Sequence, residues 1–109
     1  MMDEFAGTLT QQIQIEALNE DRTESGLTSS TWIPVFSCRS CVVPEGAGAE
    51  AEGMAFSGMP RMRFLVRRSL AVAVQQRVRW RGRFFMIRQV YEDPRQPERI
   101  ELRCEEIRA

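Results

Sequence analysis

Histidine and lysine are both missing from this chain of 109 residues. Without histidine, the commonest general base and metal ligand is absent, and a serine or cysteine nucleophile lacks the partner that usually activates it. The glycines match neither the P-loop nor the dinucleotide-binding pattern. We therefore expect no catalytic residues and no cofactor, and the chain is not expected to be an enzyme.

Cysteine is scarce. The chain has an odd number of cysteines, three: Cys38, Cys41 and Cys104. A structural zinc site takes four Cys or His ligands, and only one further thiol accompanies the Cys38-x-x-Cys41 pair. The odd number and the absence of a secretion signal also argue against a disulfide framework. We expect reduced thiols packed as small residues in or beside a strand, with redox chemistry as the weaker alternative.

Long hydrophobic runs are absent as well. The longest uncharged apolar stretch, residues 69–76, is far shorter than the roughly 20 residues that a membrane helix needs, so no membrane partner is expected. The amino terminus begins with acidic residues and lacks the basic and apolar segments of a secretory signal, which predicts a protein that stays in the cytoplasm where it is made. At this length the chain has room for one domain, residues 1–109.

Charge is abundant and unevenly distributed. All fifteen basic residues are arginine, and nine of them lie within residues 61–88, which contain no acid. Residues 1–52 hold nine acids against two arginines, whereas residues 53–109 hold thirteen arginines against six acids. A formal net charge of zero therefore describes two oppositely charged halves, able to bind polyanions or other copies of the same chain.

Apolar and polar residues alternate with a period of two through much of the chain, which indicates half-buried strands. Six strands are predicted, over residues 11–17, 31–43, 61–68, 77–81, 83–91 and 99–107. Residues 19–30 resemble a polar loop or wide hairpin connection, and Arg81-Gly82 a tight hairpin turn. This pattern predicts an all-β fold, a small antiparallel β-barrel or sandwich of about six strands with one long loop.

The same alternation predicts which side chains face the core, with the arginines and the acids of the last strand facing water. The expected inward residues of the last four strands are Met62, Phe64, Val66, Val78, Trp80, Phe84, Met86, Val90, Ile100, Leu102 and Cys104. Glu101, Arg103 and Glu105 are expected on the outer face.

Residues 44–60 form the long loop. Pro44 ends the second strand, and Met54, Phe56 and Met59 are the large apolar residues of a segment rich in alanine and glycine. Loops longer than about 12 residues in compact domains are usually functional or disordered, so this loop is a candidate contact element.

Several weak signals follow one another in a specific order along nearly the whole chain. They are Gly7-x-Leu9 before Ile13-x-Ile15, Thr31-Trp32, Val42 with Pro44 and Gly46, Phe64-x-Val66-Arg67, Val78-x-Trp80-x-Gly82 with Phe85 and Ile87, and Arg99-x-Glu101-Leu102-x-Cys104-Glu105. In this order and spacing the chain resembles the phage head-tail joining family, whose members are also called head-closure, stopper or head-tail adaptor proteins.

This resemblance implies a small β-barrel that assembles with copies of itself into a ring of six or twelve subunits. The ring would lie below the portal or adaptor ring, close the head after DNA packaging, and offer the surface where a tail terminator or tail tube protein docks. Assembly would take place in the host cytoplasm, with the finished ring in the neck of a phage, prophage or gene transfer agent particle. The resemblance carries over no catalytic residues.

The family's long loop lines or plugs the channel that holds the packaged DNA. By position, the resemblance assigns that role here to Pro44, Glu45, Gly46, Glu50, Glu52, Met54, Phe56 and Met59.

The uneven charge supports ring assembly independently of the resemblance, because a ring needs contacts in which one face of a subunit meets a different face of the next. We predict that Arg63, Arg67, Arg79 and Arg81 meet acids of a neighbouring subunit or ring, the candidates being Glu16, Glu20, Asp21 and Glu24. A solvated arginine face is the plainer alternative, since surface charges often contribute little.

Two other functions fit part of the pattern. A small nucleic-acid-binding barrel would use arginines interleaved with aromatic residues, here Trp80, Phe84, Phe85 and Tyr91, to contact phosphates and bases. Against it, Trp80 and Phe84 fall on the face expected in the core, and a balanced total charge is unusual for such a binder. A tail-completion protein or other virion connector differs only in the partner that it touches.

Overall fold

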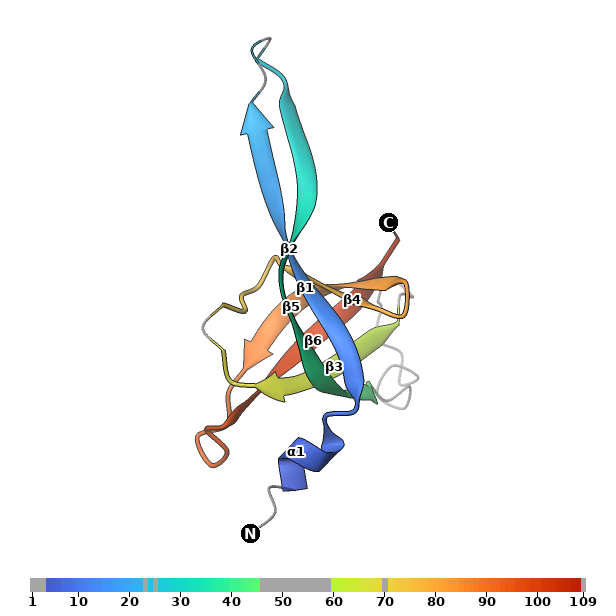
Figure 1. The fold of residues 1–109 in the computed structure, drawn as a ribbon, viewed down its shortest axis with the longest axis vertical. Helices are drawn as coiled ribbons and strands as arrows, with labels where there is room; N and C mark the ends of the chain where they lie inside the picture. Colours follow the sequence, from blue (N-terminus) through green and yellow to red (C-terminus); the bar gives the residue numbers. More distant parts are fainter. Residues whose placement is uncertain (1–3, 23, 25, 46–59, 70, 109) are drawn as a thin grey trace, which may run out of the picture.

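Six strands form a closed antiparallel barrel in the computed structural model, which describes residues 4–22, 24, 26–45, 60–69 and 71–108 (Figure 1). The elements are α1 (Glu4–Thr8), β1 (Gln11–Arg22), β2 (Thr28–Pro44), β3 (Arg61–Arg67), β4 (Arg77–Trp80), β5 (Arg83–Tyr91) and β6 (Arg99–Ile107). Around the barrel the order is β1-β2-β3-β6-β5-β4, and every neighbouring pair is antiparallel. The predicted all-β fold class is confirmed.

The core lies inside the barrel and includes three aromatic rings. Phe64 is fully buried, with its ring centroid 5.3 Å from that of Phe85 and 5.9 Å from that of Trp80. Such inclined aromatic pairs add roughly 0.5–1.5 kcal/mol each beyond the area that they bury. Most inward positions are confirmed: Met62, Phe64, Val66, Val78, Ile100, Leu102 and Cys104 are buried, and Trp80 and Val90 pack against them partly buried.

Two positions of β5 face the opposite way from the prediction. Phe84 and Met86 lie on the outer face, whereas Phe85 and Ile87 are almost completely buried. All four residues are apolar, so periodicity did not distinguish the two faces. The register of the β4–β5 hairpin decides between them, because the buried Val78 pairs with Phe85 and cross-strand partners share a face.

Two local features set that register along β5. The predicted turn is confirmed, with positive φ angles at Arg81 (52°) and Gly82 (73°), as a two-residue type I′ hairpin turn requires. Farther along, a bulge between Ile87 and Gln89 shifts the pairing with β6 and returns Val90 to the core side.

β1 and β2 continue beyond the barrel as a projecting two-stranded hairpin (Figure 1). Their pairing runs from Ala17 opposite Ile33 to Arg22 opposite Thr28. We call residues 17–33, as far as they are described, the arm. By contrast, β4 pairs with β1 only opposite Gln14, Ile15 and Glu16.

Residues 19–30, predicted as a polar loop or wide hairpin connection, do join two strands of a hairpin. The predicted connection is too long at both ends, because residues 19–22 and 28–30 are strand. Neither face of the arm packs against the core, so its strands do not show the alternation of apolar and polar residues that predicts a half-buried strand. They are held by hydrogen bonding to each other. The turn between them includes Gly26 at a φ of 83°.

The short helix α1 was not expected from the sequence. Its Phe5 and the following Leu9 are buried, and the Arg99 guanidinium lies 4.4 Å from the Phe5 ring. Five residues are too few for a periodic signal, so tertiary packing holds this turn. α1 and the arm lie at opposite ends of the molecule (Figure 1). Within the described residues, no helix has the length and apolar character needed to cross a membrane.

Candidate assembly surfaces

Acids of β6 neutralise much of the arginine-rich surface. Arg83 donates two hydrogen bonds to Glu106, at 2.8 Å from Nε and 2.7 Å from Nη2, and Arg88 Nη2 lies 3.2 Å from Glu105 Oε1. The Arg83 guanidinium holds the pKa of the Glu106 carboxyl below its ordinary value. Eight arginines of the described residues have a carboxylate partner: Arg63, Arg68, Arg77, Arg83, Arg88, Arg95, Arg99 and Arg103.

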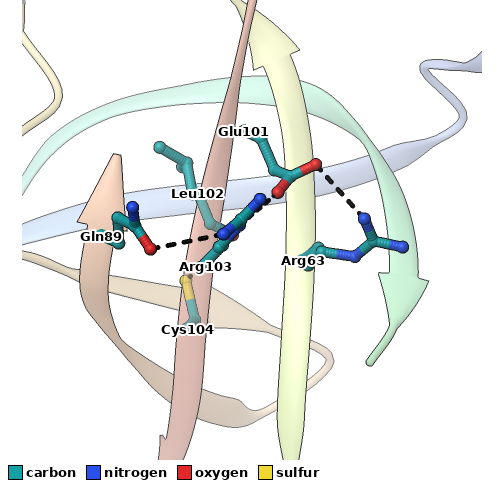
Figure 2. Close-up of polar contacts among 6 residues, drawn as sticks. All are labelled: Arg63, Gln89, Glu101, Leu102, Arg103 and Cys104. Atoms are coloured by element: carbon teal, nitrogen blue, oxygen red, sulfur yellow. Dashed lines mark hydrogen bonds and ion pairs between the residues drawn. The ribbon is translucent and has the colours of Figure 1, made fainter. Parts of the chain in front are cut away.

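A polar network connects β3, β6 and β5 across the outer face (Figure 2). Glu101 accepts hydrogen bonds from Arg63 Nη1 at 3.4 Å and from Arg103 Nε at 2.5 Å, and Arg103 Nη1 donates to Gln89 Oε1 at 3.5 Å. The Arg103 guanidinium also lies 4.8 Å from the Tyr91 ring. Glu101 and Arg103 are on the outer face as expected, and Arg63, expected to meet another subunit, is engaged within its own chain.

The least exposed ion pair among the described residues joins Glu16 of β1 to Arg77 of β4. Arg77 Nε donates to Glu16 Oε1 at 2.6 Å, and their side chains are 12% and 6% exposed respectively. The Arg77 guanidinium lies 4.4 Å from the Trp32 ring and 4.1 Å from the Phe84 ring. We call these four residues the arm anchor, because they tie the base of the arm to the β4–β5 hairpin.

The arm anchor places two predicted residues in roles that the sequence did not indicate. Glu16, a candidate for contact with a neighbour, is buried against its own chain. Phe84, expected in the core, forms one wall of the Arg77 site. Glu16 and Arg77 are far apart in the sequence and meet only because the barrel closes through β1 and β4.

Arg79 and Arg81 remain exposed near the β4–β5 turn. Arg81 Nη2 donates to Gln11 Oε1 at 3.0 Å and its guanidinium lies 4.9 Å from the Trp80 ring, while that of Arg79 lies 5.8 Å from the Phe84 ring. Among the residues that the structure describes, no carboxylate is within ion-pair distance of either arginine. Of the four arginines predicted at an interface, these two are brought together, and Arg67 lies elsewhere, exposed at the end of β3.

The arm carries the other predicted charges. Glu20, Asp21 and Glu24 are exposed along it or at its tip. Large apolar side chains are also exposed on these two strands and their connection, and the alternating sequence pattern did not indicate them: Leu18 (43%), Leu27 (69%) and Ile33 (44%) in the arm, and Val35 (43%) at its base. The sequence did contain a signal for this exposed apolar surface, because residues 25–38 include no charged residue. The outer part of β2, which falls in this range, packs against no core. Exposed apolar groups beside acids are typical of a contact surface.

The two ends of the predicted channel loop lie close together. Pro44 is the last residue of β2, and the Glu45 N–H donates to the Arg61 carbonyl oxygen at 3.2 Å. The remaining candidates, Gly46, Glu50, Glu52, Met54, Phe56 and Met59, lie outside the described residues.

All three cysteines are free thiols, as expected. Cys38 and Cys41 are half-buried on β2, and Cys104 is buried on β6. Burial raises the pKa of the Cys38 and Cys104 thiols. Within the described parts of the chain, no cluster of three or more His, Cys, Asp or Glu side chains is arranged to hold a metal ion.

Two solved structures share this fold over almost their full length. The solution structure of protein SF1141 from Shigella flexneri 2a matches with a TM-score of 0.74 and 23% identity, covering 92% of this chain and 94% of that one. A chain in the virion of a native gene transfer agent particle matches with a TM-score of 0.65 and 19% identity, covering 93% and 97%. A search of the curated proteins found no significant match.

The family comparison covers nearly the whole sequence. Residues 6–107 match the model of the phage head completion protein family. This span contains the complete barrel and the arm. The chain therefore belongs to the phage head completion protein family and is a structural virion protein of head-tail joining.

Proposed function

We propose that this protein forms a ring of six or twelve copies below the portal or adaptor ring, in the neck of the virion. There it closes the DNA-filled head and presents the surface to which a tail terminator or tail tube protein attaches. The observation that carries the proposal is the family match over residues 6–107. The fold adds support, because the arm projects from the closed barrel and is exposed to a partner.

The structure narrows the predicted ring contact. Arg63 and Glu16 are engaged within the chain. Arg79 and Arg81 are exposed at one place, and the acids of the arm are exposed at another. We propose that the ring forms when Arg79 and Arg81 of one copy meet Glu20, Asp21 or Glu24 of the next.

The 44–60 loop is proposed to line or plug the channel that holds the packaged DNA. Its two ends leave the barrel together at Glu45 and Arg61. Deleting residues 47–58 should therefore leave the barrel folded and release DNA from filled heads. Heads that retain their DNA after this deletion would contradict the channel role.

Electron microscopy of particles made without this gene tests the main proposal. We expect heads without tails, finished free tails beside them, and DNA lost from the heads. Intact tailed particles would reject head closure.

Replacing both Arg79 and Arg81 by glutamate tests the ring contact separately. We expect a folded protein that no longer assembles, since like charges would then face each other. Exchanging the exposed Arg95 for glutamate is the control, because its partner Asp93 is only two residues away in the chain. Normal assembly of the doubly reversed variant would contradict this contact.

Nucleic-acid binding is less well supported than it was from the sequence. Eight arginines are engaged by carboxylates of their own chain, and Phe85 is buried where no base can stack on it. Strongly salt-dependent binding of the purified protein to generic DNA would restore that alternative.

A further inference from the structure

A pocket of about 230 Å³ opens at the end of the barrel where β1 begins. Its apolar lining includes Val42, Pro44, Met62 and Trp80, and Arg81 lies at its edge. Tryptophan and arginine are the residue types that most often dominate binding energy at protein interfaces.

Two of the pocket's side chains are already fixed in place. Trp80 Nε1 and Arg81 Nη2 donate hydrogen bonds to the same oxygen, Gln11 Oε1, at 3.2 and 3.0 Å. Side chains held in this way lose little further conformational freedom when a partner binds. The pocket therefore offers a preformed apolar surface with a positive charge at its rim.

The tip of the arm has the complementary chemistry. Leu27 is 69% exposed, the largest exposed fraction among the large apolar side chains that the structure describes. The acids of the arm, Glu20, Asp21 and Glu24, are exposed in the same hairpin. An apolar side chain accompanied by acids matches an apolar pocket with an arginine at its rim.

The arm cannot occupy the pocket of its own chain. Gln11, beside the pocket, begins β1, and Arg22, at the outer end of the arm, is the last residue of the same 12-residue strand. At about 3.3 Å per residue the two ends are roughly 36 Å apart. The Glu16–Arg77 pair holds the base of the arm against the barrel, away from the pocket.

We propose that Leu27 of one copy inserts into the pocket beside Trp80 of the next copy, with the arm's acids against Arg81. This inference rests on the proposed ring and names the contact that forms it. The contact is heterologous, since the arm of each subunit meets the barrel end of another, and such contacts close into rings when the rotation between subunits allows.

A second pocket, of about 320 Å³, is the alternative binding site for the arm. Its lining includes Leu9, Phe36 and Cys38 together with three arginines, Arg39, Arg67 and Arg68. Arg68 is already paired with Glu92 at 3.2 Å, whereas Arg81 has no carboxylate partner among the described residues. Arg39 at the second pocket likewise has no carboxylate partner among the described residues, so charge alone does not separate the two pockets. The first pocket is favoured because it offers Trp80, which is held in place by its hydrogen bond to Gln11.

Native cysteines distinguish the two pockets, because Cys41 lines the first and Cys38 the second. We would purify particles carrying Leu27→Cys, oxidise them mildly, and map the new disulfides by mass spectrometry. The proposal predicts links between residue 27 and Cys41 of another copy, giving a ladder of multimers that disappears when Cys41→Ser is added. Links to Cys38, links between two copies of residue 27, or no links at all would overturn it.

Function is tested in parallel with Leu27→Asp, supplied to particles that lack the native gene. We expect heads without joined tails, as with the gene deletion, while Leu27→Met restores tailed particles. Val74→Asp is the matched control, since Val74 is also an exposed apolar residue (50%) and does not line the pocket. Tailed particles with Leu27→Asp would overturn the inference alone, whereas tailed particles in the gene deletion would overturn the proposed function itself.

Discussion

Replacing Arg77 by alanine would leave the Glu16 carboxylate, whose side chain is only 6% exposed, without its ion-pair partner. It would also remove the guanidinium that lies 4.1 Å from the Phe84 ring and 4.4 Å from the Trp32 ring. Removing one partner of a buried ion pair costs about 3–5 kcal/mol, and a cation–π contact contributes about 0.5–2 kcal/mol. Because this pair lies on the outer face of the barrel, we expect the lower end, about 3 kcal/mol in the free energy of unfolding.

Urea unfolding of four purified proteins measures this effect: the wild type, Arg77→Ala, Glu16→Gln and the double variant. If the two side chains stabilise the arm as a pair, the double variant should lose about 2 kcal/mol less than the sum of the single losses. Arg83→Ala is the control, because its pair with Glu106 is more exposed, at 43% and 19%, and such pairs are worth up to about 1 kcal/mol. Equal losses for Arg77→Ala and Arg83→Ala, or strict additivity in the double variant, would refute the arm anchor.

Three further predictions test the core, the ion pairs and the thiols. Phe85→Ala should destabilise the protein by about 3–5 kcal/mol and Phe84→Ala by clearly less, since only Phe85 is fully buried; equal losses in urea unfolding would contradict the β5 register. The pKa of Glu106 is lowered in the folded state by Arg83, so the stability from this pair is present above the ordinary carboxyl pKa of 4.5 and is lost as the pH falls through the lower folded value. Arg83→Met should therefore remove part of the loss of stability seen on acidification, and an unchanged acid limb in a plot of stability against pH would argue against the pair. Burial raises the pKa of Cys104, so alkylation of this thiol at pH 8 should become measurable only in urea; labelling of the native protein at the rate of an exposed thiol would show that the β6 core opens.

The sequence predicted the strands of the barrel well because each has one buried face. Phe64 and Val66 alternate with outward-facing residues, and in β6 Leu102 and Cys104 do the same. The turn at Arg81-Gly82 could also be predicted from the sequence, because two successive positive φ angles favour a glycine at the second position. These features depend on residues close in the sequence.

What the sequence did not predict depends on pairing between distant strands. Phe84 and Phe85 are adjacent and equally apolar, so only the register against Val78 decides which enters the core. The arginines of residues 61–88 looked uncompensated because their carboxylate partners come from residues 16, 92, 101, 105 and 106. Alternation along one strand carries no information about charges on its neighbour.

Ion pairing within the barrel also decides which charges remain for assembly. Arg77 and Arg83 are engaged by Glu16 and Glu106, whereas the described residues provide no acid for Arg81. The first exposed acid of the arm, Glu20, lies nine residues along β1 from Gln11 beside the pocket, or roughly 30 Å at about 3.3 Å per residue. At physiological salt, screening reduces interactions between exposed charges beyond about 8 Å, so these two groups hardly attract each other within one copy. In the proposed ring they would neutralise each other between copies, in head-to-tail order. That pairing would give a chain with a net charge of zero a direction of self-association, which a ring requires and which a uniformly solvated arginine face would not supply.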